Sequence, residues 1–349
     1  MLSRLSGLLR CDLAIDLGTA ATRVALPGEG VVVQEPSVVA VSRRGNRILS
    51  GGCAVGHLAH QMCGRTPDSI SVVRPLSAGV ITDFHLCEAM LRYFLAKARP
   101  LRWGLRPRLL VAAAGCLTPV EKRAIFTSAH RAGAGQVLLL RVAHAAALGV
   151  GLPIAEPVAN MVIDIGAGAT EAAVLSLGDV VASQSTRTGG DAMDLAIIDW
   201  LRRAHGLRIG LSTAEQLRIQ IGSAWPSGDE QSEEVRGLDV TTGMPRRLEI
   251  NSAGVQSALA EPLAKILETA RATLDQCSPD LVSDLVDRGI VLCGGGALLR
   301  GLDRWLSHRI GIPARVAPDA TTAVVQGTLT CLEHLDQWRE LVESSDEAL

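Results

Sequence analysis

A strand–turn–strand pattern with an aspartate at its first turn occurs twice in this chain. The apolar segment Leu13–Ile15 leads into Asp16 and a glycine-containing turn, and a second apolar segment returns at Thr22–Leu26. The same order recurs between residues 161 and 176, with Asp164 at the corresponding position. An internal repeat of this kind predicts a duplicated architecture, with a ligand held between the two halves.

Strand and helix signals alternate through the rest of the chain. Apolar residues at helical spacing predict a helix over 85–98, and a capping box at Thr118 predicts another that runs to about Ala132. We also expect a short helix over 143–149, one long helix over 255–276 and a helix over 298–308. A strand pair over 235–250 is expected to turn at Thr242 and Gly243. Alternation with short connections indicates an α/β fold, in which each lobe has a central mixed sheet flanked by helices.

The length of 349 residues is too great for one compact core and suits two domains. We expect two lobes, each with a small subdomain, and a separate segment at either end of the chain. The expected bounds are 1–10 for an amphipathic segment, 11–142 plus 315–340 for the first lobe (small subdomain about 31–74), 143–314 for the second lobe (small subdomain about 182–247), and 341–349 for an acidic, disordered tail.

Composition and hydropathy limit the partners and the location that can be expected for this chain. A hydrophobic fraction of 48% and a charged fraction of 20% fit a folded protein, and a net charge of −2 gives no reason to expect nucleic acid as a partner. No apolar run reaches the ~18–20 residues needed to cross a bilayer. No signal peptide is recognisable either, so we expect a cytoplasmic protein.

The first ten residues carry leucines at helical spacing. Leu2, Leu5, Leu8 and Leu9 fall within an arc of roughly 120° when wound as a helix, and the arginines of this segment lie outside that arc. This pattern is typical of a short helix that lies on an anionic membrane surface. A frayed terminus with chance leucines is the alternative.

Four glycine-containing segments are candidates for binding a nucleotide. Glycine turns between strands expose backbone N–H groups that phosphate oxygens can accept, and an aspartate at the end of a strand suits Mg²⁺ held through water. The metal candidates are therefore Asp16 and Asp164. The candidate nucleotide-binding residues are Gly18, Thr19, Ala20 and Ala21 in the first turn, Gly166, Ala167, Gly168 and Ala169 in the second, Gly189, Gly190 and Asp191 before a helix, and Gly294, Gly295, Gly296 and Ala297.

The order of these segments resembles the superfamily of actin, heat-shock chaperones and sugar kinases, and most closely the MreB family of bacterial actins. The resemblance covers nearly the whole chain. It rests on segments such as Ala14–Ala20, Gln34–Ala40, Gly79–Phe84, Val120–Ile125, Thr213–Glu215, Ile221–Ala224 and Cys293–Arg300. It also places Glu215 and Arg218 at the adenosine.

Several functional expectations follow from the resemblance alone. It implies ATP with Mg²⁺, and filaments, with antiparallel paired protofilaments packed through the helix over 118–132. It implies peripheral attachment to the inner face of the cytoplasmic membrane, helped by a second loop with Leu101 and Trp103. The implied function is to organise the cell-wall elongation machinery and so maintain cell shape.

The chain departs from the family at positions that bear on catalysis. Val142 stands where the family has a catalytic glutamate, and valine can neither orient a water molecule nor take its proton. In the phosphate turns, Ala21, Ala167 and Ala169 replace a family Asn, Gly and Thr. We therefore expect nucleotide binding with impaired hydrolysis, and we interpret His144 as a packed or surface-exposed residue rather than a substitute catalyst.

Other functions remain open on the sequence. A sugar kinase would need a carboxylate base, which residues 141–147 do not offer, and a chaperone ATPase would be expected to continue into a β-rich domain. A non-hydrolysing, non-polymerising scaffold of the same fold, or a regulatory paralogue that co-polymerises with a competent relative, is the stronger alternative.

Overall fold

The computed structural model describes residues 12–43, 47–49, 54–98, 106–226 and 231–344. Contacts between residues divide the chain into two compact units. Unit 2 is the continuous segment Pro157–Ala320. Unit 1 combines the residues up to Glu156 with those from Thr321 onward. The expected membrane residues lie outside the described residues; these are Leu2, Leu5, Leu8, Leu9, Leu101 and Trp103. No helix within the described ranges is both long enough and apolar enough to span a membrane.

Unit 1 is built on a mixed sheet with the strand order β19-β10-β9-β1-β2-β3. β1 pairs in parallel with β9 and antiparallel with β2, so the expected strand–turn–strand pattern is a true hairpin. The strands are β1 (Asp12–Leu17), β2 (Ala21–Leu26), β3 (Gly30–Pro36), β9 (Arg108–Ala113), β10 (Gln136–Arg141) and β19 (Val342–Ser344).

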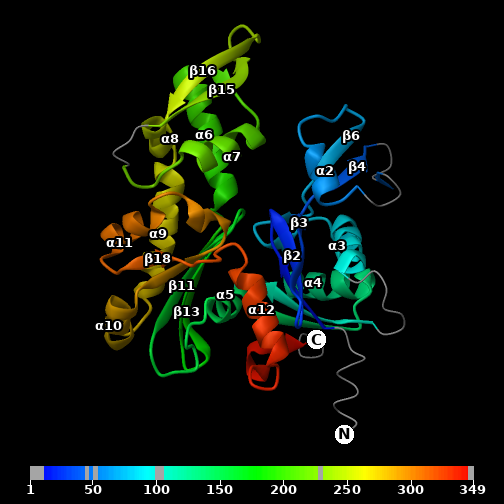
Figure 1. The fold of residues 1–349 in the computed structure, drawn as a ribbon, viewed down its shortest axis with the longest axis vertical. Helices are drawn as coiled ribbons and strands as arrows, with labels where there is room; N and C mark the ends of the chain where they lie inside the picture. Colours follow the sequence, from blue (N-terminus) through cyan, green and yellow to red (C-terminus); the bar gives the residue numbers. More distant parts are fainter. Residues whose placement is uncertain (1–11, 44–46, 50–53, 99–105, 227–230, 345–349) are drawn as a thin grey trace. The chain divides into compact units, whose positions relative to one another are not determined.

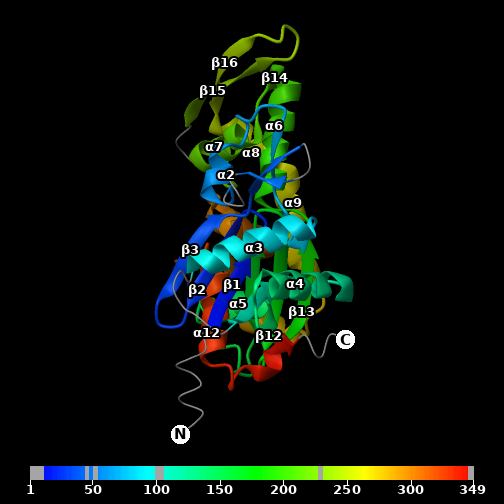
Figure 2. The same cartoon turned by 90° about the vertical axis from the view of Figure 1, so that its right-hand side faces the viewer.

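Helices cover both faces of this sheet (Figures 1 and 2). One face packs against α3 (Phe84–Ala98) and α4 (Pro119–Ala132), and the shared core includes Leu13 and Ile15 of β1. The other face meets α5 (Val142–Gly149) and α12 (Ala323–Glu333). Because side chains alternate along a strand, Asp12, Ala14 and Asp16 lie on this second face.

The predicted capping box at α4 is confirmed. Thr118 accepts a hydrogen bond from the backbone N–H of Glu121, whose carboxylate accepts one from the Thr118 N–H at 2.7 Å. Pro119 follows the cap, where its missing N–H costs nothing. Gly133 ends the helix in the left-handed conformation, as expected from the sequence.

Glycine allows α5 and α12 to approach each other closely. A Cβ at Gly149 would collide with the carbonyl group of Ala323, and one at Gly327 would collide with that of Ala145. Three further alanines of α5 are buried: Ala143, Ala146 and Ala147. The helix over 143–149 was expected, whereas α12 was not assigned from the sequence.

The expectation of a disordered tail from residue 341 is wrong for its first residues. Val342–Ser344 form β19, which pairs antiparallel with β10 at the edge of the sheet. The Lys122 ammonium group of α4 donates to Glu343 at 2.7 Å. An acidic segment therefore became a strand because an open sheet edge and a lysine were available to it; residues 345–349 lie outside the described residues.

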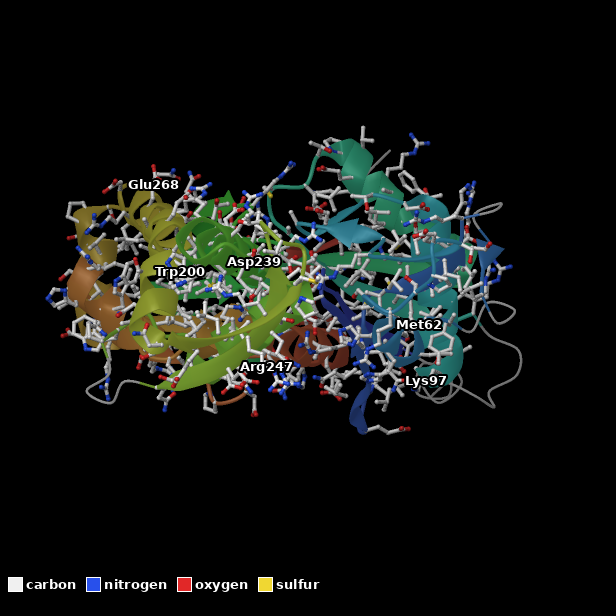
Figure 3. The ribbon with its side chains drawn as sticks, turned by 90° about the horizontal axis from the view of Figure 1, so that it is seen from above. Met62, Lys97, Trp200, Asp239, Arg247 and Glu268 are labelled. Atoms are coloured by element: carbon white, nitrogen blue, oxygen red, sulfur yellow. The ribbon has the colours of Figure 1, made fainter. Side chains whose placement is uncertain are left out.

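A small sheet of unit 1, with the order β5-β4-β6, occupies the part expected as the first small subdomain. The buried carboxylate of Glu35 links this part to neighbouring elements. It accepts hydrogen bonds from Lys97, which Figure 3 labels, and from the backbone N–H of His57. The elements are β4 (Val39–Ser42), β5 (Arg47–Ile48), α2 (His57–Gln61) and β6 (Ile70–Val73). A separate two-stranded sheet is formed by β7 (Leu76–Ser77) and β8 (Val80–Ile81).

Unit 2 repeats the plan on a sheet with the order β13-β12-β11-β17-β18. β11 pairs antiparallel with β12 and in parallel with β17, as β1 does with β2 and β9. The elements are β11 (Asn160–Ile165), β12 (Thr170–Ser176), β13 (Asp179–Thr186), α9 (Ala260–Leu274), α10 (Pro279–Arg288), β17 (Ile290–Cys293), a 3₁₀ turn η2 (Gly295–Leu298), α11 (Leu302–Ile310) and β18 (Ala314–Val316).

A second small sheet belongs to unit 2. Its long hairpin turns at Thr242–Gly243 as expected, and Figure 3 labels Asp239 and Arg247 on it. Arg246 forms an ion pair with Asp239 at 3.2 Å across this hairpin. The elements are α6 (Gly190–His205), β14 (Leu207–Arg208), α7 (Leu211–Ile221), β15 (Ser232–Asp239), β16 (Pro245–Asn251) and α8 (Ser252–Ala258).

Some element bounds differ from those expected. The single helix expected over 255–276 is two helices, α8 and α9, joined at Leu259. The helix α11 begins only after Gly301, whose φ of 68° interrupts the helical backbone. The divisions between units fall at 156/157 and 320/321, later than the expected 142/143 and 314/315, because α5 packs on α12 within unit 1.

Candidate functional site

The first glycine turn joins β1 to β2 in unit 1. Leu17 and Thr22 are the last paired residues before the turn, so Gly18–Ala21 form its tip. A Cβ on Gly18 would lie 2.6 Å from the carbonyl oxygen of Ala21. Only glycine therefore fits this sharp bend without a shift of the backbone.

Ser37 stabilises the first turn through hydrogen bonds from its hydroxyl and its backbone N–H. Its hydroxyl donates to the Gly18 carbonyl oxygen at 2.6 Å and accepts from the Thr22 hydroxyl at 2.8 Å, and its N–H donates to the Ala20 carbonyl oxygen at 2.9 Å. The Gly79 N–H donates to the Thr19 hydroxyl at 3.0 Å. Sequence reasoning gave Ser37 no part in the site, because this bracing joins residues from separate strands.

Asp16, the first expected metal ligand, is paired with an arginine side chain. In the β1–β2 register it lies opposite Arg23, and its Oδ2 is 3.1 Å from Nη1 of that arginine. The two side chains are only 16% and 15% exposed. Burial raises the pKa of Asp16 above its usual range, and the Arg23 guanidinium opposes that rise.

The second glycine turn joins β11 to β12 in unit 2 and has the same construction. Ile165 pairs with Thr170, and the Gly166 N–H donates to the Ala169 carbonyl oxygen at 2.9 Å. Ala167 carries no strain here, since Ala78 and Leu177 are the only non-glycine residues with positive φ in the described ranges. The possible cost of replacing a family glycine at 167 therefore does not arise.

The third segment, Gly189–Asp191, packs directly on the second turn. The Gly190 N–H donates to the Gly166 carbonyl oxygen at 3.0 Å, and the Asp191 N–H donates to that of Ala167 at 2.8 Å. A Cβ on Gly189 would lie 2.7 Å from the Ala167 carbonyl oxygen. These two N–H groups at the start of α6 hold the turn in place instead of pointing to a ligand.

The fourth segment, Gly294–Ala297, lies at the carboxyl end of β17 beside Asp164. Gly294 has a φ of 81°, and a Cβ there would lie 2.7 Å from Oδ1 of Asp164. Asp164 stands opposite Cys293 in the β11–β17 register. Burial, and to a lesser degree this aspartate, raises the pKa of the Cys293 thiol to about 12.

Arg218 lies near this group of segments but is held by a residue that the sequence analysis did not single out. Its Nε donates to Oδ1 of Asp194 at 2.6 Å and its Nη2 to Oδ2 at 3.3 Å. Glu215 lies 4.0 Å from the same guanidinium and is about half exposed. A Cβ on Gly190 would lie 3.4 Å from Nη2, so the arginine reaches the third segment.

Replacing Asp194 with alanine is expected to lower the stability of unit 2. The pair is largely buried, and the change removes both hydrogen bonds that the Arg218 guanidinium makes to Asp194, at a cost of about 3 kcal/mol. The double variant D194A/R218M removes both charges and is expected to recover most of that loss. Urea unfolding of the two variants measures both effects, and equal instability of the two would contradict this account.

Comparison with known proteins shows the family to which the chain belongs. The sequence profile described as "MreB/Mbl protein" matches residues 10–340. The chain is 46% identical over 337 residues to the "Cell shape-determining protein MreB" of Escherichia coli K12, with 96% of this chain and 97% of the relative covered. It belongs to the MreB/Mbl family of actin-like cell-shape proteins.

Other members of the MreB/Mbl family support the assignment. The "Cell shape-determining protein Mbl" of Bacillus subtilis is 39% identical, with 93% and 97% covered. The crystal structure of MreB5 of Spiroplasma citri bound to ADP matches with a TM-score of 0.89 at 31% identity, over 95% of this chain and 98% of that one. The MamK double helical filament matches with a TM-score of 0.78 at 20% identity, over 93% and 99%, and supports the fold alone. The expected actin-like fold and the resemblance to MreB are therefore confirmed.

Val142 occupies the position where the MreB resemblance places a catalytic glutamate. It is the first residue of α5, and the first turn of that helix contains no acidic residue. His144, two residues further on, is buried, with 2% of its surface exposed. It therefore lies inside unit 1 as a packed residue, in line with the interpretation from the sequence.

The donors expected for magnesium fit that ion only in part. Asp16 is paired with Arg23 in unit 1, so it does not offer a free carboxylate to a hydrated cation. Asp164 lies at the end of β11 next to Gly294, where it suits a water-mediated contact. Within the described ranges no three His, Cys, Asp or Glu side chains gather as a metal site.

Proposed function

We propose that this member of the MreB/Mbl family binds ATP and hydrolyses it slowly. The observation that carries the proposal is the pair of glycine turns, each of which directly follows a strand that ends near an aspartate. Backbone N–H groups in such turns suit phosphate oxygens. A relative of 32% identity, MreB5 of Spiroplasma citri, has a structure described as bound to AMPPNP, which supports an adenine nucleotide here.

The proposed contacts divide between the units. Unit 1 offers Gly18–Ala21 to the phosphates. Unit 2 offers Gly166–Ala169 to the phosphates and Gly294–Ala297 with Glu215 to the adenosine, whereas Arg218 and Gly189–Asp191 hold these segments in place. Magnesium would enter with the nucleotide and neutralise phosphate charge, with Asp164 as its water-mediated contact.

Slow hydrolysis follows from the side chain at Val142. Attack by water on the terminal phosphate needs a group that orients the water and accepts its proton, and a hydrocarbon side chain does neither. A slow hydrolase would form long-lived filaments, or would stabilise mixed filaments with a hydrolysing relative.

We also propose that the protein forms membrane-bound filaments in the cytoplasm that organise the cell-wall elongation machinery. The family assignment supports this, as does the surface of α4, where Val120 is 76% exposed. Antiparallel pairing of protofilaments would place this surface between two copies. Attachment to the inner face of the membrane would rest on the leucines of residues 2–9 and on Leu101 and Trp103.

Filament assembly on anionic liposomes tests the proposal. We expect pelleting with lipid and straight paired filaments by negative-stain microscopy with ATP, less polymer with ADP, and least without nucleotide. Deleting residues 2–9 is expected to reduce lipid binding and leave nucleotide binding unchanged. Single particles in every condition, with normal nucleotide binding, would instead favour a non-polymerising scaffold.

A further inference from the structure

An arginine stands at the place where the nucleotide's metal would be expected. Arg23 is the residue of β2 directly opposite Asp16, one step from the Leu17–Thr22 pair that closes the first glycine turn. Residues directly opposite in an antiparallel pair have Cβ atoms about 5 Å apart, on the same face of the sheet. The guanidinium is thus built into the base of the turn that we assign to the phosphates.

Arg23 has N–H donors that its contact with Asp16 does not use. Nη1 donates to Asp16, and Nε is buried without a hydrogen-bond partner among the described residues. A guanidinium has five N–H donors in a plane and matches phosphate oxygens well. Arg23 is therefore equipped to contact the carboxylate of Asp16 and a phosphate at the same time.

A positive charge is needed beside Asp16 if a triphosphate binds at the first glycine turn. A carboxylate next to a triphosphate is repelled by it unless positive charge lies between the two, and in a partly buried site that repulsion is strong. A hydrated magnesium ion commonly supplies the charge. Here the guanidinium already pairs with Asp16, and it would itself repel a second cation.

We propose that Arg23 replaces magnesium at Asp16, so that this protein binds ATP with little dependence on Mg²⁺. The inference rests on the proposed function, since it concerns the same nucleotide. Magnesium would remain bound to the phosphates and near Asp164, but its removal would leave the charge at Asp16 balanced.

The chain offers a matched control for this arginine. Arg108 of β9 forms an ion pair with Asp12 at the opposite end of β1 and lies opposite it in the parallel register. Both arginines are thus partly buried partners of an aspartate on the same strand. Arg108 lies away from the glycine turn, so its loss tests the general effect of removing such an ion pair.

The experiment measures ATP affinity with saturating MgCl₂ and with EDTA, by displacement of a fluorescent ATP analogue below the protein concentration at which polymer scatters light. We expect the unmodified protein and R108L to change affinity by less than about 3-fold on chelation. R23L is expected to lose about 10-fold or more in affinity on going from magnesium to EDTA, the scale of one charge-assisted hydrogen bond. R23K, which keeps the charge, is expected to retain binding in EDTA.

Distinct results would overturn the inference and the function on which it rests. If the unmodified protein loses 10-fold or more on chelation, or R23L loses no more than R108L, Arg23 does not replace the metal although ATP binds. If no variant binds ATP in either condition, the proposed function fails as well. Thermal unfolding of R23L and R23K checks that the hairpin folds, and R23K decides the question if R23L does not.

Discussion

Replacing Val142 with glutamate is expected to raise the rate of phosphate release from ATP by about 10²-fold or more, the usual contribution of one positioned general base. The side chain at this position is half-buried at the start of α5. A carboxylate there also interacts favourably with the N-terminal end of the helix dipole. The change should therefore restore a catalytic group without disturbing the fold.

Two further variants separate catalysis from other effects of the substitution. V142L keeps the residue apolar and is expected to leave phosphate release at its low rate. V142Q can orient water but cannot take its proton, so an intermediate rate is expected. Single-turnover phosphate release with excess protein measures all three, and a rapid rate in the unmodified protein would refute impaired hydrolysis.

Replacing Gly327 with valine is expected to destabilise unit 1 by about 3 kcal/mol, toward the upper end for overpacking of a core. A Cβ at this position would lie 2.5 Å from the backbone nitrogen of Gly149 and closer still to the Ala145 carbonyl oxygen. Because the obstacle is backbone on a facing helix, no side-chain rotation relieves it. α5 and α12 would have to separate along their whole contact.

Thermal unfolding followed by circular dichroism measures this effect. For a unit of this size, 3 kcal/mol corresponds to a fall in the transition midpoint of about 6–12 °C. Gly210→Ala is the matched control, because a Cβ at Gly210 meets no atom within 4 Å and its φ is −89°. A midpoint for G327V equal to that of G210A would show that the two helices do not require the glycine.

The local features of this fold could be predicted well from the sequence. The two strand–Asp–glycine hairpins, the capped helix from Pro119 and the hairpin turning at Thr242–Gly243 each follow from residues close together in the chain. Such signals depend on backbone conformation and capping, which act over a few residues.

Features that depend on distant partners could not be predicted. β19 is a strand only because β10 leaves an edge open to it, and α12 has no strong caps of its own. In the candidate site, the pairing of Asp16 with Arg23 follows from strand register, and that of Asp194 with Arg218 follows from the packing of α6 on α7. Spacing along the chain carries no direct signal of either contact.

The last residues of unit 1 have a consequence for how the chain is made. On the ribosome, β1 to β10 and α5 emerge first, but α12 and β19 follow only after the whole of unit 2 has been synthesised. Until then one face of the first sheet is covered by α5 without α12, and the edge of β10 is open. Unit 2, whose residues are contiguous, can complete its core earlier, so the half that is translated second is the first able to reach its native state.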